Sequence, residues 1–88
     1  MNEVLVILAE ECAELIQVIQ KLHRFGEADE RNRKRLQQEI GDVVAMLLLC
    51  ENEGFIDDKI MKSNIKKKLR KLKKYSKIEG LEATIKKL

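Results

Sequence analysis

Apolar residues recur at a helical spacing over the first part of the chain. Positions 4, 5, 8, 12, 15, 16, 19 and 22 form one broad stripe at the helical step of about 100° per residue. This stripe predicts a helix from residue 2 to about residue 24, with Asn2 as its cap and Gly26 as its stop. Residues 26–31 are polar, and so short a stretch predicts a connection within one domain.

A second helix is predicted from about Arg33 to Glu53, with Asn32 as a candidate cap and Gly54 after its end. Its first half is amphipathic. The run from Val43 to Cys50 is apolar around the whole circumference, unlike a helix on a protein surface. This half of the helix must therefore be surrounded, and two other helices of so small a chain cover only part of it.

A third helix is predicted from Asp57 or Asp58, either of which can cap it, to about Tyr75. Its narrow apolar stripe consists of Met61, Ile65, Leu69 and Leu72. The remaining tail carries a short amphipathic piece that needs another surface to dock on. We therefore predict an all-α fold of three main helices plus a short C-terminal helix. It forms one domain, 1–88, with a core at 1–75 and a tail at 76–88.

Composition supports this assignment and narrows the setting. The chain has 88 residues, no proline, no tryptophan and many Leu, Ile, Lys and Glu, which favours helices. Its longest apolar run is far shorter than the roughly 20 residues that span a bilayer, and no secretory signal is evident. Cys12 and Cys50 are predicted to be reduced and buried, and His23 to be a helix-end residue without a ligand role. Together these features predict a cytoplasmic protein with no membrane partner.

Two acidic motifs interrupt the apolar stripes. Glu11 falls inside the stripe of the first helix and Glu14 at its edge, while Glu10 points further toward solvent. Glu39 and Asp42 repeat this arrangement on the second helix. The pattern predicts that four carboxylates, those of Glu11, Glu14, Glu39 and Asp42, face protein.

An ionised carboxylate that leaves water needs a hydrogen bond, a cation or a metal. Pairs spaced i, i+3 on two antiparallel helices place four oxygen ligands near one another, and Mg²⁺ prefers such oxygen ligands. A single pair of this kind is usually a solvated face. Two pairs, both set into apolar stripes, favour a metal site.

The motifs also resemble a known family. Glu10, Glu11 and Glu14, followed after 24 residues by Glu39 and Asp42, resemble the EExxE...ExxD signature of the MazG-like, all-α nucleoside triphosphate pyrophosphohydrolases. The likeness extends from the start of the chain to about residue 75. It implies a Mg²⁺-dependent enzyme, with Mn²⁺ as a possible substitute, that converts a nucleoside triphosphate to the monophosphate and pyrophosphate.

The same resemblance assigns roles. It makes Glu11, Glu14, Glu39 and Asp42 the metal ligands and leaves Glu10 either to bind a second metal or to orient the attacking water. Members of the family are commonly dimers or tetramers. We therefore expect a homodimer or homotetramer in which the second helix completes a core of the four-helix-bundle type.

Charge divides the chain. Residues 1–58 carry six basic and thirteen acidic side chains, net −7, and residues 59–88 carry twelve basic and two acidic, net +10. Most of these lysines are expected to form a solvated face. Lys62, Lys68 and Lys71 are candidates for contacting substrate phosphates, because a triphosphate at an acidic metal site needs further positive groups.

Two functions remain from different classes. The first is the magnesium-dependent hydrolase. The second is a non-enzymatic helical module that binds nucleic acid or a partner through the basic third helix. Such a module has no use for buried acid pairs, and one tyrosine and two phenylalanines give it little with which to stack bases. The sequence therefore favours the hydrolase without naming the base or sugar of its nucleotide.

Overall fold

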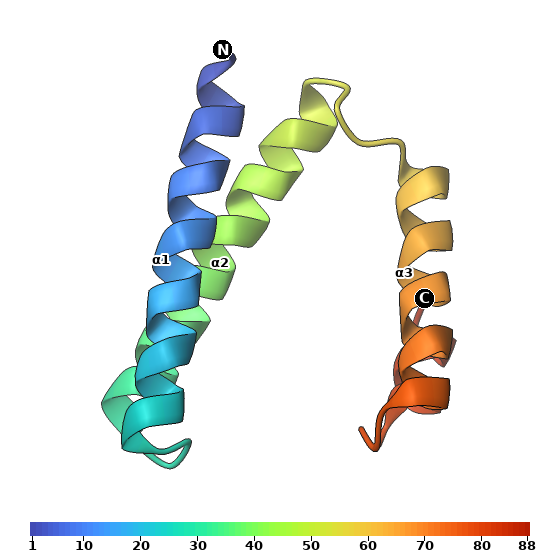
Figure 1. Ribbon diagram of the computed structural model, residues 1–88. Coiled ribbons are helices and arrows are strands. Elements are labelled where there is room, and N and C mark those ends of the chain that lie inside the picture. The colour runs from blue at the N-terminus through green and yellow to red at the C-terminus, as the bar shows by residue number, and fades with distance from the viewer. The chain divides into compact units, whose positions relative to one another are not determined.

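The computed structural model describes residues 1–88 and is entirely helical (Figure 1). Its elements are α1 (Glu3–Phe25), α2 (Glu30–Asn52), α3 (Asp58–Tyr75) and α4 (Leu81–Lys86). The all-α prediction of three main helices and a short C-terminal helix is confirmed. The chain divides into a hairpin unit, Met1–Glu53, and a C-terminal unit, Gly54–Leu88.

In the hairpin unit, α1 and α2 lie side by side and run in opposite directions (Figure 1). Asn2 caps α1 as predicted, because its Oδ1 accepts a hydrogen bond of 2.8 Å from the backbone N–H of Val4. The same side chain donates to Glu53 Oε2 at 2.6 Å and so joins the two open ends of the hairpin. At the closed end, Gly26 adopts φ 97°, a conformation that favours glycine, and its N–H donates to the Leu22 carbonyl.

The predicted start of α2 is wrong by one turn. The helix begins at Glu30, and its cap is Asp29, whose Oδ1 accepts a hydrogen bond of 3.0 Å from the Asn32 backbone N–H. Arg33 N–H donates to the Asp29 carbonyl at 2.9 Å, so the earlier start adds backbone hydrogen bonds that a cap at Asn32 would forgo. Asn32 itself lies in the first turn and is buried.

The core is thin. Val18, Cys50 and Leu81 are the buried apolar side chains, and both cysteines are free thiols. Within the hairpin unit the apolar half of α2 is not surrounded by α1: Val44, Leu47, Leu48 and Leu49 are 45%, 40%, 63% and 45% exposed. One partner helix covers one side of α2, which leaves these side chains as an apolar surface.

In the C-terminal unit, Asp57 caps α3 by accepting a hydrogen bond of 3.0 Å from Ile60 N–H, which decides between the two predicted caps. The chain turns at Gly80, which has φ 79°, and α4 packs against α3. Leu81 is buried and Lys73 pairs with Glu82, so the tail docks as expected. The hydrogen bond and positive charge of Lys73 lower the pKa of Glu82. None of the four helices has the length and apolar character to cross a bilayer.

Candidate metal centre

The antiparallel pairing of α1 and α2 brings the two acidic motifs to the same level of the hairpin. Carboxylate oxygens of Glu11, Glu14 and Glu39 all lie within 4.8 Å of one another. Glu11 and Glu14 are neighbours on α1 because residues three apart share a helical face, and Glu39 reaches them from α2. Asp42 lies outside this triplet, although its charge acts on Glu11. We call Glu11, Glu14 and Glu39 the carboxylate cluster.

The prediction that four carboxylates face protein needs correction. Glu11 and Glu39 are half-buried, whereas Glu14 and Asp42 are exposed, as is Glu10. Only the centre of each apolar stripe is covered when two helices pack, and residues at the edges of the stripes keep contact with solvent. The cluster therefore has two shielded members and an open side.

The shielded members lack hydrogen-bond donors. Glu11 Oε2 and Glu39 Oε2 are both buried, and neither accepts a hydrogen bond from a surrounding group. A buried ionised oxygen without a donor is unfavourable, so a shared proton or a bound cation would stabilise the two carboxyl groups. These unpartnered oxygens, with Glu14 beside them, form an all-oxygen donor set that fits a hard divalent cation such as Mg²⁺.

Burial raises the pKa of the Glu11 carboxyl above its ordinary value of 4.5. The negative charges of Glu14, Asp42 and Glu39 raise this pKa further, and protonation of Glu11 would also supply the hydrogen bond to Glu39 that the ionised pair lacks. Glu11 therefore holds a proton to higher pH than an isolated carboxyl group does.

This pKa shift predicts how the metal-free protein responds to pH. The folded chain holds the Glu11 proton to higher pH than the unfolded chain, so the free energy of unfolding falls as pH rises from about 4.5 through the folded pKa. In EDTA, Glu11→Gln should melt progressively higher than wild type across this interval, and added Mg²⁺ should reverse the order. Thermal melts from about pH 4 to 7 measure the difference, and a pH-independent difference would contradict the assignment.

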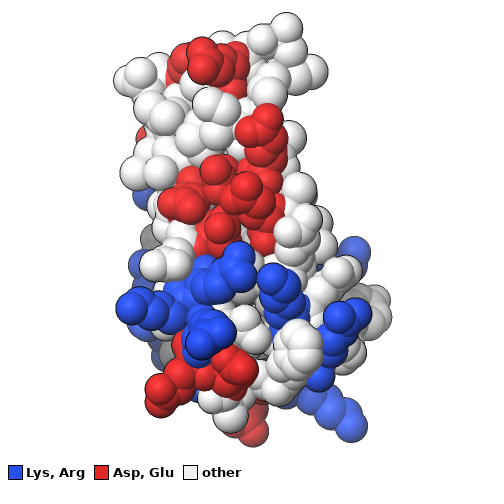
Figure 2. All heavy atoms as spheres, turned by 90° about the vertical axis from the view of Figure 1, so that its left-hand side faces the viewer, with Lys and Arg blue, Asp and Glu red and all other residues white.

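Basic side chains adjoin the acidic ones on the hairpin. Figure 2 shows acidic side chains gathered halfway along the molecule and basic side chains directly below them, toward the α1–α2 turn. A hollow of about 230 Å³ there is lined by Gln17, Gln20, Lys21 and Arg24. Sequence reasoning missed these residues, although one signal was present: all six Lys and Arg side chains of the hairpin unit fall between positions 21 and 35.

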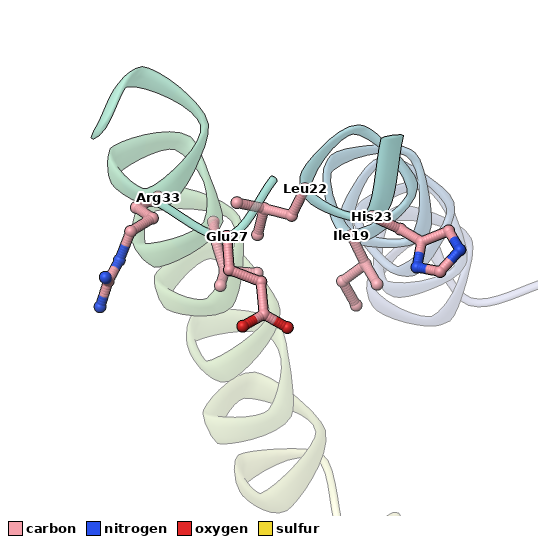
Figure 3. Close-up of a pocket in the computed structure, with 6 residues that line it drawn as sticks. Ile19, Leu22, His23, Glu27 and Arg33 are labelled. Carbon is pink, nitrogen blue, oxygen red and sulfur yellow. The ribbon is translucent and has the colours of Figure 1, made fainter. Parts of the chain in front are cut away.

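A second hollow at the closed end, of about 430 Å³, is lined by Ile19, Leu22, His23, Glu27, Arg33 and Leu36. Figure 3 shows Ile19, Leu22 and His23 on α1, with Glu27 between the two helices and Arg33 on α2. His23 lies in the last turn of α1, as expected for a helix-end residue. Ile19 is half exposed, and together with Leu22 and Leu36 it gives this hollow an apolar lining that the hollow beside Lys21 lacks.

The three lysines proposed to contact phosphate belong to the C-terminal unit, while the cluster belongs to the hairpin unit. Lys62 pairs with Asp58 at 3.2 Å, an exposed i, i+4 pair. Lys68 lines a shallow hollow of about 400 Å³ on α3 with Met61, Asn64, Ile65 and Leu69. Lys71 is exposed and makes no ion pair. Lys68 is therefore the lysine of the three that adjoins a hollow.

Comparison with models of protein families identifies the family of this chain. The model of the MazG nucleotide pyrophosphohydrolase domain matches residues 1–76, which include both acidic motifs and all of α3. The chain belongs to the MazG family. This membership supports nucleotide pyrophosphohydrolase activity and does not favour the nucleic-acid-binding alternative. No curated protein and no solved structure matches the chain significantly.

Proposed function

We propose that this MazG protein is a magnesium-dependent nucleoside triphosphate pyrophosphohydrolase that releases a nucleoside monophosphate and pyrophosphate. The observation that carries the proposal is the carboxylate cluster, in which one oxygen from each of three carboxylates lies within 4.8 Å of the other two. Two of these carboxylates, Glu11 and Glu39, also have a buried oxygen that accepts no hydrogen bond. Family membership supports the reaction class. The donor chemistry supports a hard cation as the partner of these oxygens.

Glu11, Glu14 and Glu39 would hold the metal, with Asp42 as a fourth ligand from the next turn of α2. When bound, Mg²⁺ or Mn²⁺ would neutralise the phosphate oxygens and lower the pKa of a coordinated water. Glu10 is exposed beside Glu11 and retains two proposed roles, either binding a second metal or orienting the attacking water. Glu14 and Asp42 lie on the open side, where substrate has access.

In the proposed reaction, one water adds to the α-phosphorus and the bond from that phosphorus to the α–β bridging oxygen breaks. The electron pair of this bond leaves with pyrophosphate, and the water gives up a proton to solvent or to a carboxylate. The carboxylates of the chain would fix the position of the cation and so the alignment of the reactants, since phosphoryl transfer depends mainly on alignment and charge stabilisation.

Product analysis tests the proposal. The protein should be incubated with Mg²⁺ and a panel of ribo- and deoxyribonucleoside triphosphates, and the products separated by ion-exchange chromatography. Monophosphate and pyrophosphate in equal amounts, abolished by EDTA, are the expected result. Release of diphosphate and orthophosphate, or turnover that persists in EDTA, would overturn it.

We also propose that the active species is a homodimer or homotetramer built around α2. The support is the apolar surface of Val44, Leu47, Leu48 and Leu49, none of which α1 buries in the hairpin unit. Covering such a surface with a second copy supplies apolar burial that so small a chain lacks on its own. The predicted single domain, 1–88, would gain its full core only in that assembly.

A smaller effect is predicted for the third helix. If Lys68 contacts substrate phosphate, Lys68→Met should raise KM several-fold, about the loss of one exposed charge-assisted contact. Lys71→Met should behave similarly, while Lys86→Met in α4 serves as the matched control. Steady-state kinetics measure the three variants, and unchanged kinetics in all of them would leave these lysines a solvated face.

A further inference from the structure

The stripe of α1 that carries Glu14 continues toward the α1–α2 turn as a row of polar and basic side chains. At about 100° per residue, Lys21 lies about 20° from Glu14 around the helix, and at 1.5 Å per residue about 10 Å further along it. Gln17 lies between the two along the axis and about 60° around it from Glu14, and Arg24 follows three residues after Lys21 on the same side as Gln17. The row therefore begins at the carboxylate cluster and ends at two cations.

These side chains line a recess. Gln17, Gln20, Lys21 and Arg24 are exposed side chains of α1 that line the open hollow of about 230 Å³ described above, and none of the four is apolar. Amide groups and cations are hydrogen-bond donors to anions, and a guanidinium offers a planar fork that matches phosphate oxygens. The hollow therefore has the chemistry of an anion site.

Neither cation is used to stabilise the fold through an ion pair. The ion pairs of the structure are Lys62–Asp58 and Lys73–Glu82, so Lys21 and Arg24 have no carboxylate partner within 4.0 Å. Arg24 instead lies over the Phe25 ring at 5.9 Å. Both positive charges remain available to an anion from solution.

Positive and negative side chains are distributed unevenly along the hairpin. Basic side chains of this unit occur only between residues 21 and 35, at the turn end, and none occurs between the cluster and the open end. A nucleoside triphosphate carries its charge at one end. Because basic side chains lie on only one side of the acidic cluster, the triphosphate end of the nucleotide is favoured on that side.

We propose that Lys21 and Arg24 hold the terminal phosphates of the substrate, so that the departing pyrophosphate points toward the α1–α2 turn. The nucleoside then lies toward the open end of the hairpin. The inference rests on the proposed function for the identity of the substrate. When the α–β bond breaks, the negative charge that develops on pyrophosphate is met by the Lys21 ammonium and the Arg24 guanidinium.

Calorimetric titration with tripolyphosphate in the presence of Mg²⁺ tests the site without any turnover. Lys21→Gln and Arg24→Gln should each weaken binding about tenfold, the order of one charge-assisted contact. Lys34→Gln is the matched control, because Lys34 is an exposed lysine of the same unit that lines a different hollow. It should stay within about twofold of wild type.

A second titration tests the orientation. Nucleoside monophosphate lacks the terminal phosphates, so its affinity should be unchanged in Lys21→Gln and Arg24→Gln. Equal loss for monophosphate and tripolyphosphate would overturn the proposed orientation. Tripolyphosphate affinity that is absent in wild type, or identical in all variants, would overturn the site.

The two proposals fail separately. If wild type binds tripolyphosphate through Lys21 and Arg24 but releases no pyrophosphate from any triphosphate, the proposed reaction is wrong and the anion site stands. If wild type releases pyrophosphate and the two variants have unchanged affinity for tripolyphosphate, the reaction stands and this site is wrong. Circular dichroism of each variant confirms that its helices are intact.

Discussion

Glu39→Gln is expected to lower turnover at least about a hundredfold, because a residue that only supports a metal ligand already accounts for about 10–100-fold and a direct ligand counts for no less. Asp42→Asn should have a large effect of the same kind if Asp42 is a fourth ligand. Both changes remove an anion and keep the size of the side chain. Steady-state pyrophosphate release at saturating Mg²⁺ measures the loss.

The same substitution should not damage the fold. Crowded carboxylates repel one another without a cation, so metal-free Glu39→Gln should melt about 1–3 °C above metal-free wild type. Stabilisation by added Mg²⁺ should disappear in the variant. Glu51→Gln, an exposed acid on the same helix, is the control and should behave as wild type. Full activity in both Glu39→Gln and Asp42→Asn would eliminate the proposed metal site.

Leu48→Glu is expected to abolish assembly and folding together. Leu48 is 63% exposed in the single chain. In a monomer, replacing so exposed a residue would change stability by no more than about 0.5 kcal/mol. In an assembly built on α2, it buries an unpaired charge in the interface, which costs several kcal/mol. The two possibilities therefore predict opposite outcomes for one substitution.

Light scattering coupled to gel filtration at low micromolar concentration measures the mass of the assembly, and circular dichroism measures its helicity. Gln37→Glu places the same charge on an exposed position of α2 and should leave mass and helicity unchanged. Wild type should elute at two or four times 10.2 kDa. A folded, active wild-type monomer, or a folded Leu48→Glu protein with wild-type mass, would exclude the assembly.

Helix existence was predictable because its signals are local. The stripe of α1, the apolar run in α2 and the stripe Met61–Leu72 each define a helix through residues within a few turns of one another. The caps Asn2 and Asp57 could be named for the same reason. The start of α2 could not, since Asp29 and Asn32 are both good caps three residues apart. Starting at Asp29 adds hydrogen bonds and places Asn32 in the buried first turn.

The candidate site was predictable in composition and less so in environment. The spacing of Glu11 and Glu14 indicated one helical face, and the structure brings Glu39 from α2 to within 4.8 Å of both. Exposure of Glu14 was not foreseen, because a stripe drawn on one helix does not say how wide a partner covers it. The basic row at Lys21 and Arg24 was overlooked because the larger basic run in α3 dominated the charge pattern.

By itself, the sequence determined that the chain is all-helical, where three of its helices lie, that it carries both acidic motifs of the MazG family, and that its charge is divided between its two ends. These properties depend on residue identity and on the 3.6-residue period, which act over short stretches. Only the tertiary structure decided which carboxylates are buried from solvent. Burial of Glu11 and Glu39, the unpartnered oxygen on each, and the exposure of Leu48 all depend on how α1 covers α2, a relation between residues far apart in the chain.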